Sequence, residues 1–374
     1  MPPRIALVTP FAFPSVRGNA VTVERIALGL RQAGVDLQVW DLSLTPEAVV
    51  EREVEAFRPG IVHAFHAYRV GPLALRLARR REIPLLVTVT GTDANHDLFD
   101  PERAATVRHV FEGAAAVVVF HESLGARIAA ALPDVAGRLV TIPQAALFSE
   151  GGTFDLAARW PMPAERVLFV FPAGIRMVKQ PLLPLAAFDR LVQRRSQVRL
   201  LYVGPVLDPA EGESLLGELA RRPWARHIGA VPHGQMKSLI GQSDVVLNCS
   251  ISEGGMPNSV LEALATGRPV LASDIEGNRS LVEDGVTGFL FRDVTELEAN
   301  AERLAADRSL RERLGLAGRQ LVERRPREVP TRGLPRATGL PIGLSRRARE
   351  RRCPTGRSPR WPAGLALRWR RRPS

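Results

Sequence analysis

Two stretches in the second half of the chain combine charged residues with glycines in a way that could bind a phosphate group. In the first, FPAGIRMVKQP (171–181), a predicted strand ends at Gly174 and is followed by Arg176 and Lys179. Two cations at the carboxyl end of a parallel strand lie where doubly wound α/β folds bind ligands. They would neutralise a diphosphate and the charge it develops as a leaving group. Taken alone, such a pair in a loop is more often solvated surface.

The second stretch, SISEGGMPNSVLEALATGRPVLASDIEGN (250–278), runs from a predicted strand through a glycine loop into a helix that begins near Asn258. Glycines let a ligand approach the backbone, and a helix N-terminus offers free N–H groups and the positive end of a dipole to an anion. Glu262 lies one turn into this helix, where a carboxylate suits a ribose diol. The spacing from Ser259 to Glu262 is also that of a helix capping box, so both interpretations stay open.

A third stretch, RGNAVTVERIALGL (17–30), follows the first predicted strand and opens a helix. It lacks the GxGxxG pattern, so no dinucleotide fingerprint is present. A turn of this kind more often only connects two elements. Gly18 and Asn19 could nevertheless touch a ligand that lies in a cleft.

These stretches must be positioned by the elements around them. Short β-branched runs recur along the chain, each followed by a segment of helical periodicity. The runs are continuously apolar rather than alternating, which is typical of a parallel sheet covered by helices on both faces. The pattern predicts doubly wound α/β domains. The predicted strands are 5–9, 37–41, 61–65, 85–90 and 116–120 in the first half, and 167–174, 198–204, 244–250, 269–273 and 288–291 in the second.

The boundaries between these series follow from composition. Residues 148–165 are rich in Gly, Pro and polar residues and are interpreted as an inter-domain linker, and the last helical pattern ends near Arg325. We therefore expect an N-terminal lobe over 1–160, a C-terminal lobe over 161–325 and a basic tail over 326–374.

Charge and cysteine content narrow the class of protein. The 374 residues have a net charge of +12, but the segment from Arg324 to the end alone contributes +14, so residues 1–323 are close to neutral. The two cysteines, Cys249 and Cys353, exclude a disulfide framework, and a cytoplasmic location fits that count. The apolar start of the chain is interpreted as a strand rather than a signal peptide. No run approaches the ~20 apolar residues that span a bilayer.

The tail after Arg325 has a different character from the rest. It is rich in Pro, Gly and Arg and has no periodicity, which favours disorder. Two other interpretations stay open: a frameshifted end of a GC-rich gene, and an arm that contacts nucleic acid or an anionic membrane.

Taken together, several segments resemble the group-one glycosyltransferase domain of the GT-B fold, in glycosyltransferase family four. The resemblance covers about residues 4–323 and is most specific in its C-terminal segments. It implies two Rossmann-like doubly wound lobes that face a cleft, the first for an acceptor and the second for a nucleotide-sugar donor. The matching segments are GNAVTVER (18–25), HAYRVG (66–71), GTDANHD (91–97), GIRMVKQP (174–181) and SISEGGMPNSVLEA (250–263).

The resemblance also implies roles for single residues. Arg176 and Lys179 would bind the donor diphosphate. Glu253 would face the donor sugar, and Glu262 would hold the nucleotide ribose. Transfer would retain the anomeric configuration, by front-face attack as the diphosphate leaves, without a metal or another cofactor. The further donor-binding candidates are Gly18, Asn19, Gly174, Gly254, Gly255, Met256, Pro257 and Asn258.

The chain departs from the family pattern in three places. Eight residues separate Glu253 from Glu262, where the family usually has seven. Thr90 stands where many relatives have a histidine that faces the sugar. The function of that histidine could be carried out by another histidine of this chain. His66, at a predicted strand end, is the first choice ahead of His96 and His121. Finally, nothing in the tail resembles the helix that usually closes the fold.

These features support a retaining glycosyltransferase as the leading hypothesis, with a nucleoside diphosphate sugar and an acceptor as its partners. The departures favour an alternative, a non-catalytic nucleotide-sugar-binding pseudoenzyme. A nucleic-acid-associated protein that acts through its basic tail is a further alternative, and an epimerase of the same fold is a minor one.

Overall fold

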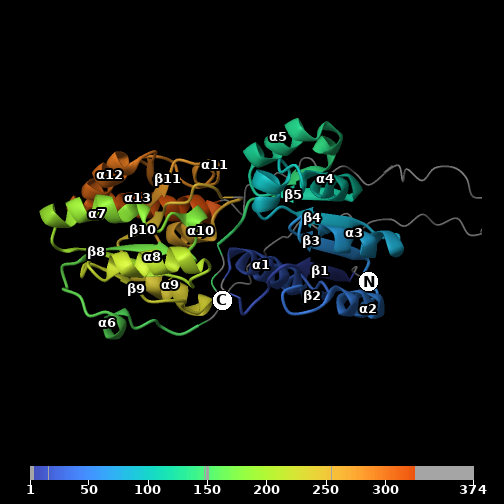
Figure 1. Cartoon of the computed structure of the whole chain (residues 1–374), viewed down its shortest axis with the longest axis horizontal. Helices are drawn as coiled ribbons and strands as arrows, with labels where there is room; N and C mark the ends of the chain where they lie inside the picture. The colour runs from blue at the N-terminus through green and yellow to red at the C-terminus, as the bar shows by residue number, and fades with distance from the viewer. Residues whose placement is uncertain (1–3, 16, 147, 149–150, 254, 325–374) are drawn as a thin grey trace, which may run out of the picture. The chain divides into compact units, whose positions relative to one another are not determined.

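The structure is a computed structural model that describes residues 4–324, apart from 16, 147, 149–150 and 254. All the described residues fall in one compact unit, which contains two parallel sheets (Figure 1). The predicted tail, 326–374, and with it the suggested nucleic-acid or membrane arm, lies outside the described residues.

The first sheet has six parallel strands in the order β2-β1-β3-β4-β5-β6. β1 pairs with β2 on one side and with β3 on the other, so the order in which strands are added to the sheet reverses at β1. The carboxyl ends of β1 and β3 are therefore neighbours at a point where the strand order reverses. The strands are β1 (Ile5–Thr9), β2 (Leu37–Asp41), β3 (Ile61–Phe65), β4 (Leu85–Thr88), β5 (Ala116–Val119) and β6 (Leu139–Thr141).

The second sheet is also fully parallel, in the order β12-β11-β10-β7-β8-β9. This is the strand order of dinucleotide-binding Rossmann domains, in which the ligand crevice opens where the order reverses. Here the reversal falls between β7 and β10. The strands are β7 (Val167–Pro172), β8 (Val198–Val203), β9 (Ala225–His227), β10 (Val245–Asn248), β11 (Val270–Ser273) and β12 (Gly288–Phe291).

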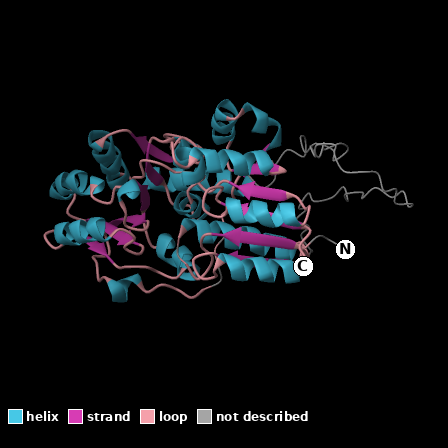
Figure 2. Ribbon diagram, turned by 45° about the vertical axis from the view of Figure 1, so that its right-hand side comes forward, coloured by secondary structure: helices cyan, strands magenta, loops and turns pink. Residues whose placement is uncertain are grey.

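Helices connect successive strands and cover both sheets (Figure 2). Around the first sheet these are α1 (Gly18–Gln32), α2 (Glu47–Phe57), α3 (Gly71–Arg80), the π-helical turn η1 (Asp93–Asp97), α4 (Ala104–Gly113), α5 (Glu122–Ala131) and the 3-10 turn η2 (Pro133–Arg138). Around the second are α6 (Leu156–Arg159), the 3-10 turn η3 (Met177–Lys179), α7 (Leu183–Arg194), α8 (Pro209–Leu219), α9 (His233–Gly241), α10 (Asn258–Ala265), α11 (Glu276–Arg279), α12 (Val294–Ala306) and α13 (Arg308–Arg324).

The core explains why the strands are continuously apolar. All five residues of β1, of β3 and most of β7 are buried, because helices pack on both faces. Separate apolar clusters lie on the two faces of each sheet. Polar residues within this core, such as His63 on β3, are the exceptions.

The predicted strands all exist, and the α/β architecture is confirmed. Four of the ten have the predicted bounds, and the other six are one to three residues shorter. Two short edge strands, β6 and β9, were not predicted, because three residues are too few to show a pattern. The predicted linker contains a short helix, α6. Pro181 lies between η3 and α7, which begins at Leu183.

No helix within the described part of the chain is both long and apolar enough to cross a membrane.

Candidate active site

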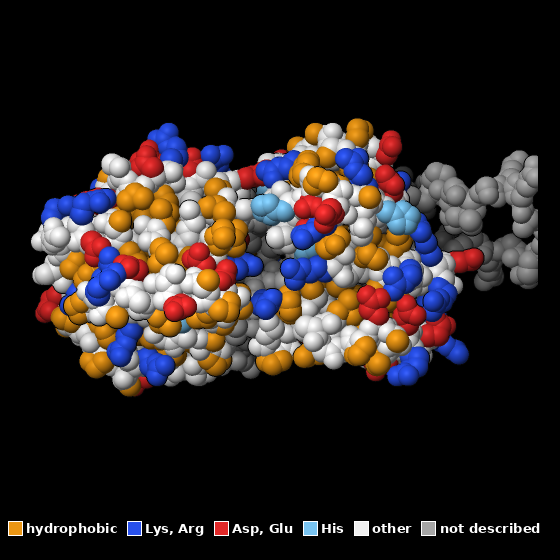
Figure 3. Space-filling view, in the orientation of Figure 1, with side chains coloured by type: hydrophobic (Ala, Val, Ile, Leu, Met, Phe, Trp, Pro, Cys, Tyr) orange, Lys and Arg blue, Asp and Glu red, His pale blue; other side chains and the backbone are white. Residues whose placement is uncertain are grey.

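A single cleft of about 870 Å³ collects the residues that the sequence singled out (Figure 3). It lies at the carboxyl ends of strands from both sheets. Lys and Arg side chains are visible along the hollow in this view. Gly254 lies outside the described residues. The predicted residues that line the cleft are Gly18, Asn19, His66, Gly174, Arg176, Lys179, Glu253, Gly255, Met256, Pro257, Asn258 and Glu262.

The two predicted diphosphate-binding cations lie at the reversal point of the second sheet. Arg176 follows β7, and Lys179 ends the single turn η3. Lys179 reaches across to the segment that follows β10, where its Nζ lies 3.2 Å from Ser250 Oγ. The two cations therefore meet the β10–α10 loop in the crevice where Rossmann-like sheets bind ligands. They do not face apart or lie on opposite faces of the sheet.

Glu253 lies at the centre of a polar cluster. Its carboxylate forms an ion pair with Lys179 and accepts hydrogen bonds from Ser250 Oγ at 2.7 Å and from Asn248 Nδ2 at 3.1 Å. Burial alone would raise the pKa of Glu253, but Lys179 and the two hydrogen bonds outweigh it and lower the pKa. Glu253 is therefore an ionised carboxylate that already has a cationic partner.

The backbone of this loop is held from both sides. The side chain of Asn95, on η1, donates to the carbonyl oxygen of Glu253 at 3.0 Å. On the other side, Gly277 packs so closely that an added Cβ would lie 2.6 Å from the Cβ of Glu253. These contacts fix the position of the Glu253 backbone.

Glu262 lines the cleft and does not cap a helix. The N-cap of α10 is Pro257, and no side chain caps this helix end, so Ser259 and Glu262 do not form the capping box that their spacing allowed. Glu262 is buried, lines the cleft, and accepts a hydrogen bond from His233 Nε2 at 2.9 Å. The uncapped N-terminus of α10 opens beside it.

Arg25 connects the two sheets behind this carboxylate. It extends from α1, donates to Asn258 Oδ1 at 3.0 Å and also bonds to Gln144. Burial lowers the pKa of Arg25 to about 10, and the negative charge of Glu262 partly opposes the shift. Asn258 Nδ2 in turn donates to the carbonyl oxygen of Gly18 at 2.8 Å, so the start of α10 is tied to the start of α1.

His66 is buried in the cleft wall directly after β3. Its backbone is in the left-handed region, with φ of 90°, which is strained for a residue with a side chain. Its Nδ1 accepts from the backbone N–H of Arg69 at 3.3 Å, which leaves Nε2 to donate to Thr92 Oγ1 at 2.9 Å. Burial lowers its pKa, and Asp93 and Asp97 oppose that shift while Arg69 adds to it. His66 is thus a neutral side chain with a fixed ring.

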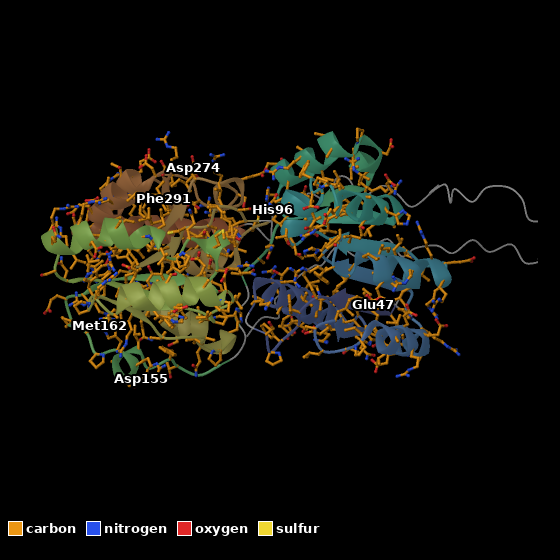
Figure 4. The ribbon with its side chains drawn as sticks, in the orientation of Figure 1. Glu47, His96, Asp155, Met162, Asp274 and Phe291 are labelled. Carbon is orange, nitrogen blue, oxygen red and sulfur yellow. The ribbon has the colours of Figure 1, made fainter. Side chains whose placement is uncertain are left out.

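The other candidates for the missing histidine differ in position. Thr90 and His96 both line the cleft, and His96 lies exposed on η1 (Figure 4). His121 does not line this cleft. Its Nδ1 caps the start of α5 by accepting from the backbone N–H of Leu124 at 3.2 Å, which is a structural role. Of the three histidines, His66 and His96 line the cleft.

Three residues of the site were not predicted. His233 holds Glu262, Asn95 holds the Glu253 loop, and Arg25 joins α1 to α10. Asn95 and Arg25 lie in the segments GTDANHD and GNAVTVER, so the signal was a polar residue inside a family motif. His233 opens α9 and carries no such signal. Among the described residues, no group of three or more His, Cys, Asp or Glu side chains is placed to hold a metal ion.

Comparison with known proteins agrees with this geometry. Residues 166–307 match the family model of group 1 glycosyl transferases. Glycosyltransferase 1 domain-containing protein 1 of Xenopus tropicalis is 28% identical over 305 residues, which cover 79% of this chain and 86% of the relative.

Solved structures show the same fold at low identity. Sucrose-phosphate synthase from Thermosynechococcus elongatus matches with a TM-score of 0.72 at 19% identity, over 86% of this chain and 94% of that chain. Alr3699/HepE from Anabaena, in complex with UDP-glucose, matches with a TM-score of 0.66 at 16% identity, over 86% and 95%. The second half of the chain is therefore similar to the group 1 glycosyl transferases, and the chain has the GT-B fold.

Proposed function

We propose that this protein is a retaining glycosyltransferase that moves a sugar from a nucleoside diphosphate donor to the hydroxyl group of an acceptor. One observation carries the proposal: Arg176 and Lys179, from the end of β7, and the uncapped start of α10, after β10, line the same crevice. Two cations and a helix N-terminus that converge from separate strand ends suit a diphosphate.

In the proposed step, the acceptor oxygen bonds to the anomeric carbon on the face from which the diphosphate leaves. The bond between that carbon and the diphosphate oxygen breaks, and its electron pair stays on the diphosphate. The same diphosphate accepts the proton of the acceptor hydroxyl. Arg176 and Lys179 stabilise the negative charge as it develops, which is where preorganised cations lower a barrier most.

The remaining site residues would orient the donor. Glu262, held by His233, would accept hydrogen bonds from the ribose hydroxyls. Glu253 and the backbone N–H groups of Gly255 and Met256 would bind the hydroxyls of the sugar. His66 would bind the far side of the sugar, in place of the histidine that Thr90 replaces, by exchanging the hydrogen bond from its Nε2 to Thr92 Oγ1 for one to a sugar hydroxyl. Gly18, Asn19, Gly174, Met256 and Asn258 would form the walls.

We also propose that the diphosphate is bound without a divalent metal, because Arg176, Lys179 and the dipole of α10 supply the positive charge. A uridine nucleotide is the first donor to test, since Alr3699/HepE was solved with UDP-glucose. A cytoplasmic location remains a prediction from the low cysteine count.

The test is nucleotide binding followed by turnover. We expect UDP or GDP to raise the thermal unfolding temperature of the full chain; a hundredfold excess over the Kd adds about 2.7 kcal/mol of stability. Nucleoside diphosphate released from a panel of donors would then identify the sugar. If no nucleotide shifts the unfolding temperature at millimolar concentration, the proposal fails. Binding without release, across donors and acceptors, would favour the pseudoenzyme.

A further inference from the structure

The first sheet has a reversal point of its own, and three side chains there, Phe11, Arg17 and Arg69, have no place in the proposed donor site. The loop after β1 carries Phe11 and Arg17, and the loop after β3 carries Arg69. All three line the cleft. β1 and β3 are hydrogen-bonded neighbours at the point where the strand order changes direction, which is the position where α/β sheets bind ligands.

The two arginines share one aromatic ring. The guanidinium carbon of Arg17 lies 4.0 Å from the centre of the Phe11 ring, and that of Arg69 lies 6.0 Å from it. Both arginine side chains are exposed. Cation–π contact restricts a guanidinium without using its N–H donors, so the donors stay available to a ligand.

The loops that carry these residues are fixed by hydrogen bonds. Thr9 Oγ1 donates to the carbonyl oxygen of Phe11 at 2.9 Å, and Asp41 Oδ2 accepts from the backbone N–H of the next residue at 2.7 Å. On the other loop, the ring of His66 accepts from the backbone N–H of Arg69. The backbone at Phe11 and the backbone at Arg69 are therefore positioned before a ligand arrives.

Ion pairing separates these arginines from other cations of the cleft. Lys179 pairs with Glu253, and Arg103 pairs with Asp97 at 3.0 Å. Within the part of the chain that the structure describes, Arg17, Arg69 and Arg176 have no ion-pair partner. These three positive charges also repel one another. Burial lowers the pKa of Arg176, and the negative charge of Glu253 opposes this shift. The positive charges of Arg17 and Arg69 lower the pKa of Arg176 further.

The cleft contains more positive charge than the donor diphosphate needs. In the proposed function, Arg176 and Lys179 are the cations that bind the diphosphate. Arg17 and Arg69 approach from the other sheet, on the side of the cleft that the acceptor must occupy. Two guanidinium groups over an aromatic ring form a suitable site for a phosphate or carboxylate, which each can bind in a bidentate manner.

We propose that Arg17 and Arg69, held against Phe11, bind an anionic group of the acceptor, so that the acceptor is an alcohol that carries a phosphate or a carboxylate. This inference rests on the proposed function, because it assumes that the donor occupies the crevice of the second sheet. It adds a specificity site for the acceptor in the crevice of the first.

The experiment measures the binding of a second ligand to the full chain saturated with UDP. Glucose 6-phosphate, glucuronate and glucose are titrated by calorimetry, and vesicles with and without phosphatidylinositol are tested by sedimentation. Wild type is compared with Arg17→Gln and Arg69→Gln. Arg108→Gln is the matched control, because Arg108 is an exposed arginine of α4 that does not line the cleft.

We expect an anionic probe to bind wild type and the control, and glucose to bind at least tenfold more weakly. Each cleft substitution should weaken anion binding about tenfold, the usual effect of losing a charge-assisted hydrogen bond, and should change the UDP affinity less than threefold. Binding to phosphatidylinositol vesicles alone would identify the anion as a lipid headgroup, and binding of a soluble probe would identify it as a free one.

Three results would overturn the inference. One is UDP binding by wild type without binding of any anionic probe or vesicle, which leaves the donor site intact. Another is a loss of UDP affinity in Arg17→Gln and Arg69→Gln as large as that of anion affinity, since both arginines would then belong to the donor diphosphate. If wild type binds no nucleotide at all, the proposed function fails, and the inference fails with it.

Discussion

Each of the two sheets forms a crevice at the point where its strand order reverses, and both crevices open into one cleft, but the side chains that line them differ. Between β7 and β10, Lys179 forms an ion pair with the partly buried carboxylate of Glu253, and Glu262 accepts a hydrogen bond from His233. Between β1 and β3, the cations Arg17 and Arg69 stand beside an aromatic ring, and no ion pair within the described residues neutralises them. The two sheets differ in strand order but each has a reversal point at the cleft, so the chemistry of each crevice depends on the few residues at the strand ends.

This difference concerns what each crevice needs before a ligand arrives. A partly buried carboxylate such as Glu253 requires a partner, because an unpaired charge with little access to water is costly. Lys179 provides it, and a donor diphosphate would have to share that lysine. The exposed arginines of the first crevice are solvated and need no partner. In the second crevice, the charge of Glu253 is thus neutralised by a residue of the protein, whereas in the first crevice only a ligand would neutralise the arginines.

The largest effect is expected where the second crevice loses both cations. Replacing Arg176 and Lys179 together by alanine removes two charge-assisted contacts of about 1.5–3 kcal/mol each. UDP affinity measured by calorimetry should fall more than a hundredfold. Lys179→Ala alone also removes the ion-pair partner of Glu253, so the pKa of Glu253 should rise.

The matched control for this variant is Arg313→Ala, because Arg313 is an exposed arginine of α13 outside the cleft. It should bind UDP like wild type. A double variant that binds UDP within threefold of wild type would show that the nucleotide does not lie between β7 and β10, and the comparison of the two crevices would lose its basis.

The sequence predicted the elements of both crevices better than it predicted their partners. Gly174, Arg176 and Glu262 could be placed because strand ends and helix starts follow from apolar runs and glycines. The ion pair of Lys179 with Glu253 could not, since its residues are 74 positions apart and meet only through the pairing of β7 with β10. The same holds for Arg25 and Asn258, which are 233 positions apart.

Local spacing was least informative where one pattern had two meanings. Ser259 and Glu262 fit a capping box, yet α10 begins one residue earlier, after Pro257, and so Ser259 is inside the helix. His66 and His121 were both candidates for a ligand-facing role. Only the strand order decides between them, because it brings β3 beside β1 at the cleft and places β5 toward the far edge of the sheet.

The second prediction separates the two sheets by acid sensitivity. His63 is buried in β3 with Nε2 2.7 Å from Thr88 Oγ1, and burial lowers its pKa to about 4. The unfolded chain therefore takes up a proton below the ordinary pKa of about 6.5, while the folded chain does not until about pH 4. Stability should be lost as the pH falls through this window, by about 3 kcal/mol.

Hydrogen exchange at pH 7 and pH 5 should show this loss in the first sheet, where burial also lowers the pKa of His66 and His121. His63→Gln removes the titrating group, so urea unfolding of this variant should depend less on pH between 6.5 and 4. An unchanged pH slope would mean that His63 does not remain neutral in the folded protein.

A smaller effect is expected at the ribose end of the second crevice. Glu262→Gln keeps an oxygen for His233 but removes the charge, so UDP affinity should fall about tenfold through one weakened charge-assisted hydrogen bond. With 2′,3′-dideoxy-UDP the variant and wild type should bind alike, because the hydroxyl partners are absent. An equal loss with both nucleotides would assign Glu262 a structural role instead.

The smallest expected effect is that of metal removal. If Arg176, Lys179 and the start of α10 carry the charge of the diphosphate between them, EDTA should change neither UDP affinity nor donor turnover, and added Mg²⁺ or Mn²⁺ should not raise them. The Arg176→Ala, Lys179→Ala variant makes this test sharper, because a metal could replace the missing charge only there. If Mg²⁺ restores UDP binding to the variant and does not change UDP binding by wild type, then UDP binding requires positive charge in the crevice rather than these two side chains.

A loss of wild-type turnover in EDTA would instead show that the two cations are insufficient, and that the second crevice, like the first, depends on a bound ion for its charge balance.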